Sequence, residues 1–100
     1  MTTLYCAEMA NPEPKFELGQ VVITKAAEEK LTPDDVALAL VRHRRGDWGD
    51  MSEADRQENE LSLKQGYRLL SVYHAADDTK FWVITERDRS ATTVLLPDDY

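Results

Sequence analysis

Residues 67–96 read YRLLSVYHAADDTKFWVITERDRSATTVLL, and this stretch decides the fold. It holds three segments rich in β-branched and aromatic residues, the composition typical of strands. Short polar turns separate the segments, and Pro97 follows the last of them. The predicted strands are 67–74, 81–86 and 92–96, and the predicted turns are 76–79 and 87–90. Strands of this length joined by such short turns predict an antiparallel meander, in which Thr85 and Thr93 face each other.

Helical segments precede the meander. Thr32 suits an N-cap, Pro33 suits the first helical position and Gly46 suits a left-handed C-cap, which together predict a helix over 33–45. The predicted apolar stripe of this helix consists of Val36, Ala37, Leu40 and Val41.

A second helix is predicted from Ser52, its cap, to Gln65, before Gly66. It is unusually polar, so either it lies mostly in solvent or its Asp55, Arg56 and Asn59 face inward in a polar network. A strand is predicted over 20–25 and a short helix over 26–31.

These elements predict an α+β fold in the order β-α-α-α-β-β-β. We expect an antiparallel sheet of three to four strands, with the first strand at an edge and the helices packed on one face. The globular domain is expected over 16–100, after a flexible lead-in at 1–15 that contains Asn11-Pro12-Glu13-Pro14.

Composition excludes several classes of protein. One hundred residues suffice for one domain, and no apolar run is long enough to span a bilayer. The single cysteine, Cys6, cannot form an internal disulfide, and the N-terminus lacks the pattern of a secretory signal, so we expect a cytoplasmic protein. The net charge of −7, from 19 acidic and 12 basic residues, disfavours direct nucleic-acid binding. Its simplest explanation is solubility, and it also suits a basic protein partner.

One polar segment, 43–50, reads HRRGDWGD. Two glycines bracket Asp47 and Trp48 and permit a tight backbone path. In the simplest interpretation this is a turn between helices whose tryptophan fills the core. In the functional interpretation Trp48 is presented to a partner, with Asp47 and Asp50 beside it, as in a binding hot spot.

A second polar segment, 85–93, reads TERDRSATT. Its charges are explained most simply by a hairpin whose strand ends stay soluble. Alternation of Glu86 and Asp88 with Arg87 and Arg89 also suits a fixed ion-pair network, or a fork for a carboxylate or phosphate.

An enzyme is the alternative. In it, His43 acts as the base and Asp47 or Asp55 orients it, Ser71 or Ser90 is the nucleophile, and Arg87 or Arg89 holds an anion. The polar pocket of this alternative consists of His43, Asp55, Asn59, Arg68, Ser71, Thr85 and Arg89. The sequence contains no nucleophile elbow, phosphate loop or metal motif. It therefore favours a non-enzymatic protein with no cofactor and no metal.

The polar residues also carry a resemblance. Its pattern is His43…Gly46-Asp47-Trp48-Gly49…Asp55…Asn59…Gly66-Tyr67-Arg68…Ser71-x-Tyr73…Trp82-x-Ile84-Thr85-Glu86-x-Asp88-Arg89-Ser90-x-Thr92-Thr93…Leu96-Pro97-x-x-Tyr100. Over residues 18–100 it resembles a family of small bacterial proteins of plasmids, phages and integrated elements. The resemblance implies a mobile-element setting and suggests an anti-defence protein, such as an anti-CRISPR or anti-restriction inhibitor.

The resulting hypothesis is a small acidic protein, a monomer or homodimer, that blocks a basic, DNA-binding surface of a host defence complex. The residues expected to bind this partner are Asp47, Trp48, Asp50, Glu86, Asp88 and Arg89. An internal network joining helices to sheet is expected from Asp55, Asn59, Arg68, Glu86 and Arg89.

Overall fold

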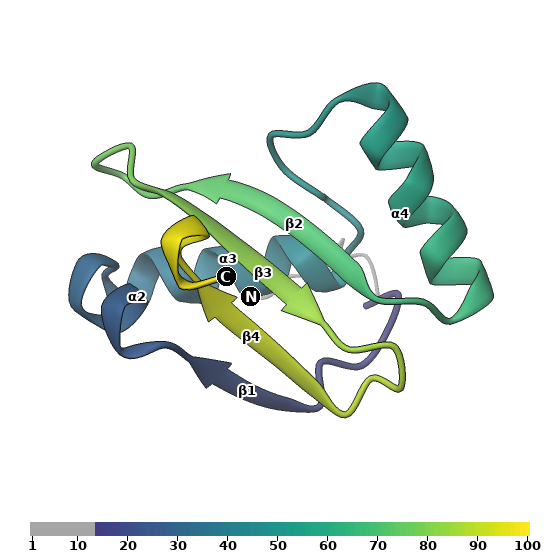
Figure 1. The fold of residues 1–100 in the computed structure, drawn as a ribbon, viewed down its shortest axis with the longest axis horizontal. Coiled ribbons are helices and arrows are strands. Elements are labelled where there is room, and N and C mark those ends of the chain that lie inside the picture. The colour runs from purple at the N-terminus through teal and green to yellow at the C-terminus, as the bar shows by residue number, and fades with distance from the viewer. Residues whose placement is uncertain (1–13) are drawn as a thin grey trace, which may run out of the picture.

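A computed structural model describes residues 14–100 (Figure 1). The elements are β1 (Gln20–Ile23), α2 (Lys25–Lys30), α3 (Pro33–Arg44), α4 (Glu53–Gln65), β2 (Leu69–His74), β3 (Lys80–Thr85), β4 (Ala91–Leu95) and the 3-10 turn η2 (Pro97–Asp99). The predicted α+β class and order of elements are confirmed. The expectations for Cys6 and for nearly all of the lead-in lie outside the described residues.

The strands form one sheet in the order β1-β4-β3-β2. The predicted meander is present, because β3 pairs antiparallel with both β2 and β4. β1 takes the expected edge position but runs parallel to β4, so the prediction of a wholly antiparallel sheet was wrong. The reason lies in the connection: α2 and α3 carry the chain across one face of the sheet, and such a crossover returns the chain to a strand of the same direction.

The register corrects one predicted pair. Thr85 lies opposite Thr92, and Thr93 lies opposite Ile84 on the other face of the sheet. This shift by one residue matters, because neighbouring side chains on a strand point to opposite faces. It places the hydroxyl of Thr92, not that of Thr93, inside the protein.

α3 covers the inner face of the sheet and begins as expected. Thr32 and Asp35 form a complete capping box, and Pro33 is the first helical residue. The predicted apolar stripe is confirmed in part. Val36 and Leu40 pack against the core, whereas Ala37 is exposed and Val41 is 42% exposed. The fully buried residues of α3 are Ala39 and His43. A histidine replaces an apolar residue on the buried face, and polar groups of the sheet satisfy it there. The core around it consists of Ala27, Leu31, Ala39, Tyr73, Ala75, Phe81, Val83 and Val94.

α4 lies beside the sheet, along the outer edge of β2, so the expectation that all helices pack on one face holds for α2 and α3 and is wrong for α4 (Figure 1). Ser52 caps its first turn, and Gly66 ends it in the left-handed conformation with φ 78°. Its one buried residue is Asn59, whose amide oxygen accepts a hydrogen bond from the Leu70 amide at 3.3 Å, while its amide nitrogen donates to the Leu70 carbonyl. The side chain thus stands in for a neighbouring strand. No helix among residues 14–100 is long and apolar enough to cross a membrane.

Candidate functional site

His43 is the centre of a buried polar network. Its Nδ1 lies 2.6 Å from Ser71 Oγ and its Nε2 lies 2.8 Å from Thr85 Oγ1. Thr85 Oγ1 lies 2.8 Å from Thr92 Oγ1, which donates to the Leu18 carbonyl at 2.7 Å. The four side chains come from α3, β2, β3 and β4, and all are fully buried. The network therefore ties the crossing helix to the three strands of the meander.

The last acceptor fixes the direction of every proton in this network. The Leu18 carbonyl can only accept, so the one hydroxyl proton of Thr92 is committed to it. Thr85 must then donate to Thr92, His43 Nε2 must donate to Thr85, and Ser71 must donate to His43 Nδ1. The imidazole is neutral because burial, and secondarily the charge of Arg89, lower the pKa of His43 to about 3.

Aromatic rings close the network from one side. The Phe16 ring packs edge-on against the His43 ring, with the ring centroids 5.1 Å apart. The Trp48 ring also packs edge-on against His43, with the centroids 5.8 Å apart. Ser71 and His43 have the contact of a nucleophile and its base, yet both are 0% exposed. A substrate cannot reach them in this structure, so the arrangement joins elements rather than opening a catalytic centre.

Trp48 lies in the interior and is 4% exposed. Its Nε1 donates to Glu60 Oε2 at 2.8 Å, which links the turn to α4. The expectation of a presented tryptophan is therefore wrong, and the core-filling interpretation of this turn is the one observed. Phe16 stacks on the indole, with the two ring centroids 6.2 Å apart.

The turn around Trp48 also pairs with the edge of β2. The Trp48 carbonyl accepts from the Val72 amide at 3.0 Å, and the Asp50 amide donates to the Val72 carbonyl at 2.7 Å. Gly49 sits between them at φ 83°, where any Cβ would overlap the Val72 carbonyl. Only glycine fits this close approach.

Asp47 remains at the surface but is already paired. Its carboxylate accepts from Arg42 Nε at 2.8 Å, and this bond lowers the pKa of Asp47. The Arg42 guanidinium also lies over the Tyr73 ring, 4.7 Å from its centroid, and the Tyr73 hydroxyl donates to the Asp47 carbonyl. The group locks the end of α3 onto β2.

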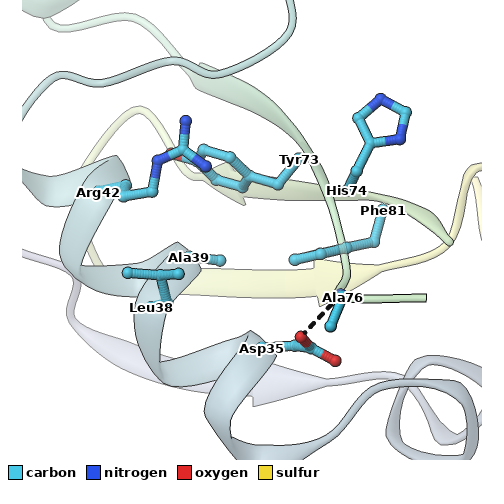
Figure 2. A pocket seen from close by; sticks show the side chains of 8 residues that line it. All are labelled: Asp35, Leu38, Ala39, Arg42, Tyr73, His74, Ala76 and Phe81. Atoms are coloured by element: carbon cyan, nitrogen blue, oxygen red, sulfur yellow. Dashed lines mark hydrogen bonds between the residues drawn. The ribbon is translucent and has the colours of Figure 1, made fainter. Parts of the chain in front are cut away.

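A surface pocket of about 190 Å³ lies next to this group, between α3 and the β2–β3 turn (Figure 2). Arg42 and His74 lie on two sides of the pocket. The Asp35 carboxylate accepts a hydrogen bond from the Ala76 amide at 3.1 Å. His74 Nε2 contacts Asp50 at 2.9 Å, and this contact raises the pKa of His74 and lowers that of Asp50. Because these charges already have partners, the pocket has the character of a packed seam rather than of a ligand site.

Arg89 organises the second polar segment from within the turn. It has a left-handed backbone at φ 60°, and its Nη1 donates to the Tyr67 carbonyl at 2.7 Å and to the Glu86 carbonyl at 3.1 Å. Asp88 accepts from the Ser90 side chain and backbone, which lowers the pKa of Asp88. Arg89 thus fastens the β3–β4 turn to the segment before β2.

The alternative polar pocket does not assemble as a whole. His43, Ser71 and Thr85 meet, whereas Asn59 serves the edge of β2 and Arg68 donates to the Tyr100 hydroxyl at 2.6 Å. Asp55 is exposed on α4. The internal network expected from Asp55, Asn59, Arg68, Glu86 and Arg89 does not form as one unit either, because Asn59, Arg68 and Arg89 bind separate partners. The expected polar pocket also lacked Thr92, whose place depends on the strand register. Neither expectation included Phe16 or Glu60, which no local pattern connects to His43 or Trp48.

α4 offers a different surface. Ten of its thirteen residues are exposed, among them the acids Glu53, Asp55, Glu58 and Glu60. It lies between the two polar segments, because Arg56 in its first half donates to the Gly49 carbonyl at 3.1 Å and Arg89 binds Tyr67 just beyond its last residue. A helix this polar on all sides, held at an edge by few contacts, is available to a partner.

Within residues 14–100 no group of three or more His, Cys, Asp and Glu side chains could hold a metal ion. Comparisons with protein-family models, curated proteins and solved structures find no match to this chain.

Proposed function

We propose that the protein is a non-enzymatic interaction protein of a mobile element, which inhibits a bacterial defence complex, of the CRISPR or restriction type, by binding its basic, DNA-binding surface. The observation that carries the proposal is the acidic, almost wholly exposed helix α4. Its flanking turns add the exposed acids Asp50 and Asp88. Carboxylates spaced along a projecting helix present negative charge to a surface built for phosphates.

The buried network supports the same choice between the two functions. An enzyme built on His43 and Ser71 requires access to both, and both are fully buried and hydrogen-bonded to each other. Two residues expected to contact the partner are not part of the proposed surface. Trp48 is buried, and the guanidinium of Arg89 donates to backbone carbonyls. The acids of α4, with Asp47, Asp50, Glu86 and Asp88 at its two ends, make up the proposed surface.

A plaque assay with matched charge variants tests the proposal. The protein is expressed in strains with an active CRISPR or restriction system, and these are challenged with a phage that the system targets. We expect the wild type to raise the efficiency of plating by orders of magnitude. A triple variant, Glu53→Gln, Asp55→Asn and Glu58→Gln, removes three charges from α4 and should lose this effect.

The control removes the same number of charges elsewhere. A triple variant of Glu28→Gln, Glu29→Gln and Asp34→Asn alters exposed acids of α2 and the start of α3, on the β1 side of the sheet, and should plate like the wild type. Equal plating by both triple variants would reject α4 as the binding surface. Failure of the wild type to protect phage from any tested system would reject the anti-defence function itself.

A further inference from the structure

The two edges of the sheet are treated differently. The outer edge of β2 is occupied at Leu70 by the Asn59 side chain and at Val72 by the backbone of Trp48 and Asp50. The outer edge of β1 has no such cover, since no strand in residues 14–100 pairs with it besides β4 on its inner side. An uncovered strand edge is a template for another strand.

The hydrogen bonds of β1 identify which groups are open. The Gln20 amide donates to the Ser90 carbonyl and the Thr24 amide donates to the Val94 carbonyl. Because successive residues alternate along a strand, the amides and carbonyls of Val21 and Ile23 point away from β4. Two donors and two acceptors are therefore presented outward.

The side chains around this edge are apolar. Val21 and Val22 are each 44% exposed, on opposite faces of the sheet. Beside Ile23, a groove of about 370 Å³ continues between α2 and α3, lined mainly by Leu31, Val36 and Leu40. The strand Gln20–Ile23 contains no charge and no proline, the residues by which natural edges avoid pairing.

We propose that β1 pairs antiparallel with β1 of a second copy of this chain, which joins two four-stranded sheets into one sheet of eight strands. A two-fold axis at Val22 matches the open groups with each other: Val21 of each copy faces Ile23 of the other, and both of these positions carry outward donors and acceptors. The two Val22 side chains then meet across the axis. Every side-chain pair in the centre of this contact is apolar, and the pairing needs only this one segment, which makes it self-complementary as a two-fold interface must be.

A second copy also accounts for the groove. Val21 of the second copy lies next to Ile23 on the groove side of the sheet, since side chains of paired residues share a face. It would cover the end of the groove next to β1. A second copy necessarily carries outward-facing backbone groups at the positions that match Val21 and Ile23. Nothing in this chain specifies such a match in a partner of different sequence.

Charge substitution at Val22 tests the pairing. By light scattering during size-exclusion chromatography, the wild type should show twice the chain mass of 11.4 kDa. The Val22→Lys and Val22→Glu variants should each shift to the monomer mass, because like charges meet at the axis. An equimolar mixture of the two variants should regain the dimer mass, with one chain of each kind in native mass spectrometry.

Leu38→Lys provides the control, because Leu38 is 61% exposed on α3 and away from the edge. It should remain dimeric. A wild type that is monomeric at about 100 µM, single variants that stay dimeric, or a mixture that stays monomeric would each overturn the proposal. Recovery in the mixture also shows that the single variants are folded. The result does not depend on the proposed function, because it measures mass alone.

Discussion

At the scale of single residues, the buried imidazole of His43 is the central feature of this protein. His43 takes a buried position on α3, one helical turn after the buried Ala39, and Ser71 and Thr85 supply a partner for each ring nitrogen. We expect His43 to be the Nε2–H tautomer, since the chain of donors ends at the Leu18 carbonyl. Its ring nitrogens should show this tautomer in long-range ¹⁵N–¹H NMR spectra, and the ring should remain neutral at pH 5. An Nδ1–H tautomer would contradict the order of donors that ends at Leu18.

The same imidazole makes stability depend on pH, and the direction follows from its pKa. The pKa of His43 is about 3 in the folded protein against an ordinary value of 6.5, so the unfolded chain binds more protons between these values. The contribution of His43 to the free energy of unfolding should therefore be fully present above pH 6.5. It should decline as the pH falls toward 3, by up to about 1.4 kcal/mol per pH unit. Because carboxylates contribute their own acid dependence, the comparison is with His43→Gln, measured by urea unfolding. The difference in free energy of unfolding between wild type and variant should become smaller as the pH falls. A difference that stays the same at every pH would show that His43 contributes nothing to the acid dependence.

At the scale of elements, the side-chain amide of Asn59 is the contact that joins α4 to the edge of β2, while Glu60 and Arg56 join α4 to the turn around Trp48. Asn59 replaces a strand at Leu70, and the rest of the helix is mostly exposed. Asn59→Ala should cost about 1–3 kcal/mol, because the Leu70 amide and carbonyl lose their partners. Exchange of the Leu70 amide with deuterium should accelerate, while the amides of β3 keep their protection. Gln57→Ala, at an exposed position of the same helix, controls for helix propensity and should leave Leu70 unchanged. Equal protection of Leu70 in the Asn59→Ala variant would show that other contacts dock α4.

Local patterns predicted elements better than their faces. The caps at Thr32, Ser52 and Gly66 are readable because they act within one turn of the chain. The inward face of α3 was not, because the reason that His43 is buried lies in Ser71 and Thr85, 28 and 42 residues away. The polar α4 was open to two interpretations in the sequence, and the structure combines them: Asn59 faces inward while most of the helix faces solvent.

At the scale of the whole molecule, the direction of β1 relative to β4 could not be predicted from the sequence pattern. β1 and β4 are neighbours although about 70 residues separate them, and a parallel pair carries no turn signal. The placement of the polar segments had the same limit. Trp48 and Arg89 both mark junctions, as their surroundings predict, but only the packed fold assigns one to the core and the other to backbone carbonyls.

The arrangement of elements across the sheet also gives the proposed dimer a definite shape. β1 and α4 lie at opposite edges of the protomer, so pairing through β1 places the two α4 helices at the far ends of the assembly (Figure 1). With β3 near the middle of each protomer, five strand spacings of about 4.8 Å separate the two centres by about 24 Å. Combined with the protomer's radius of gyration of 14.0 Å, this distance predicts a radius for the dimer about 1.3 times that of the monomer. Sheets stacked face to face, about 10 Å apart, would give a ratio of about 1.1. Small-angle X-ray scattering of the wild type and the Val22→Lys variant at equal concentration measures this ratio directly, and a value near 1.1 with a dimeric mass would show that the copies meet through a face of the sheet instead of through β1.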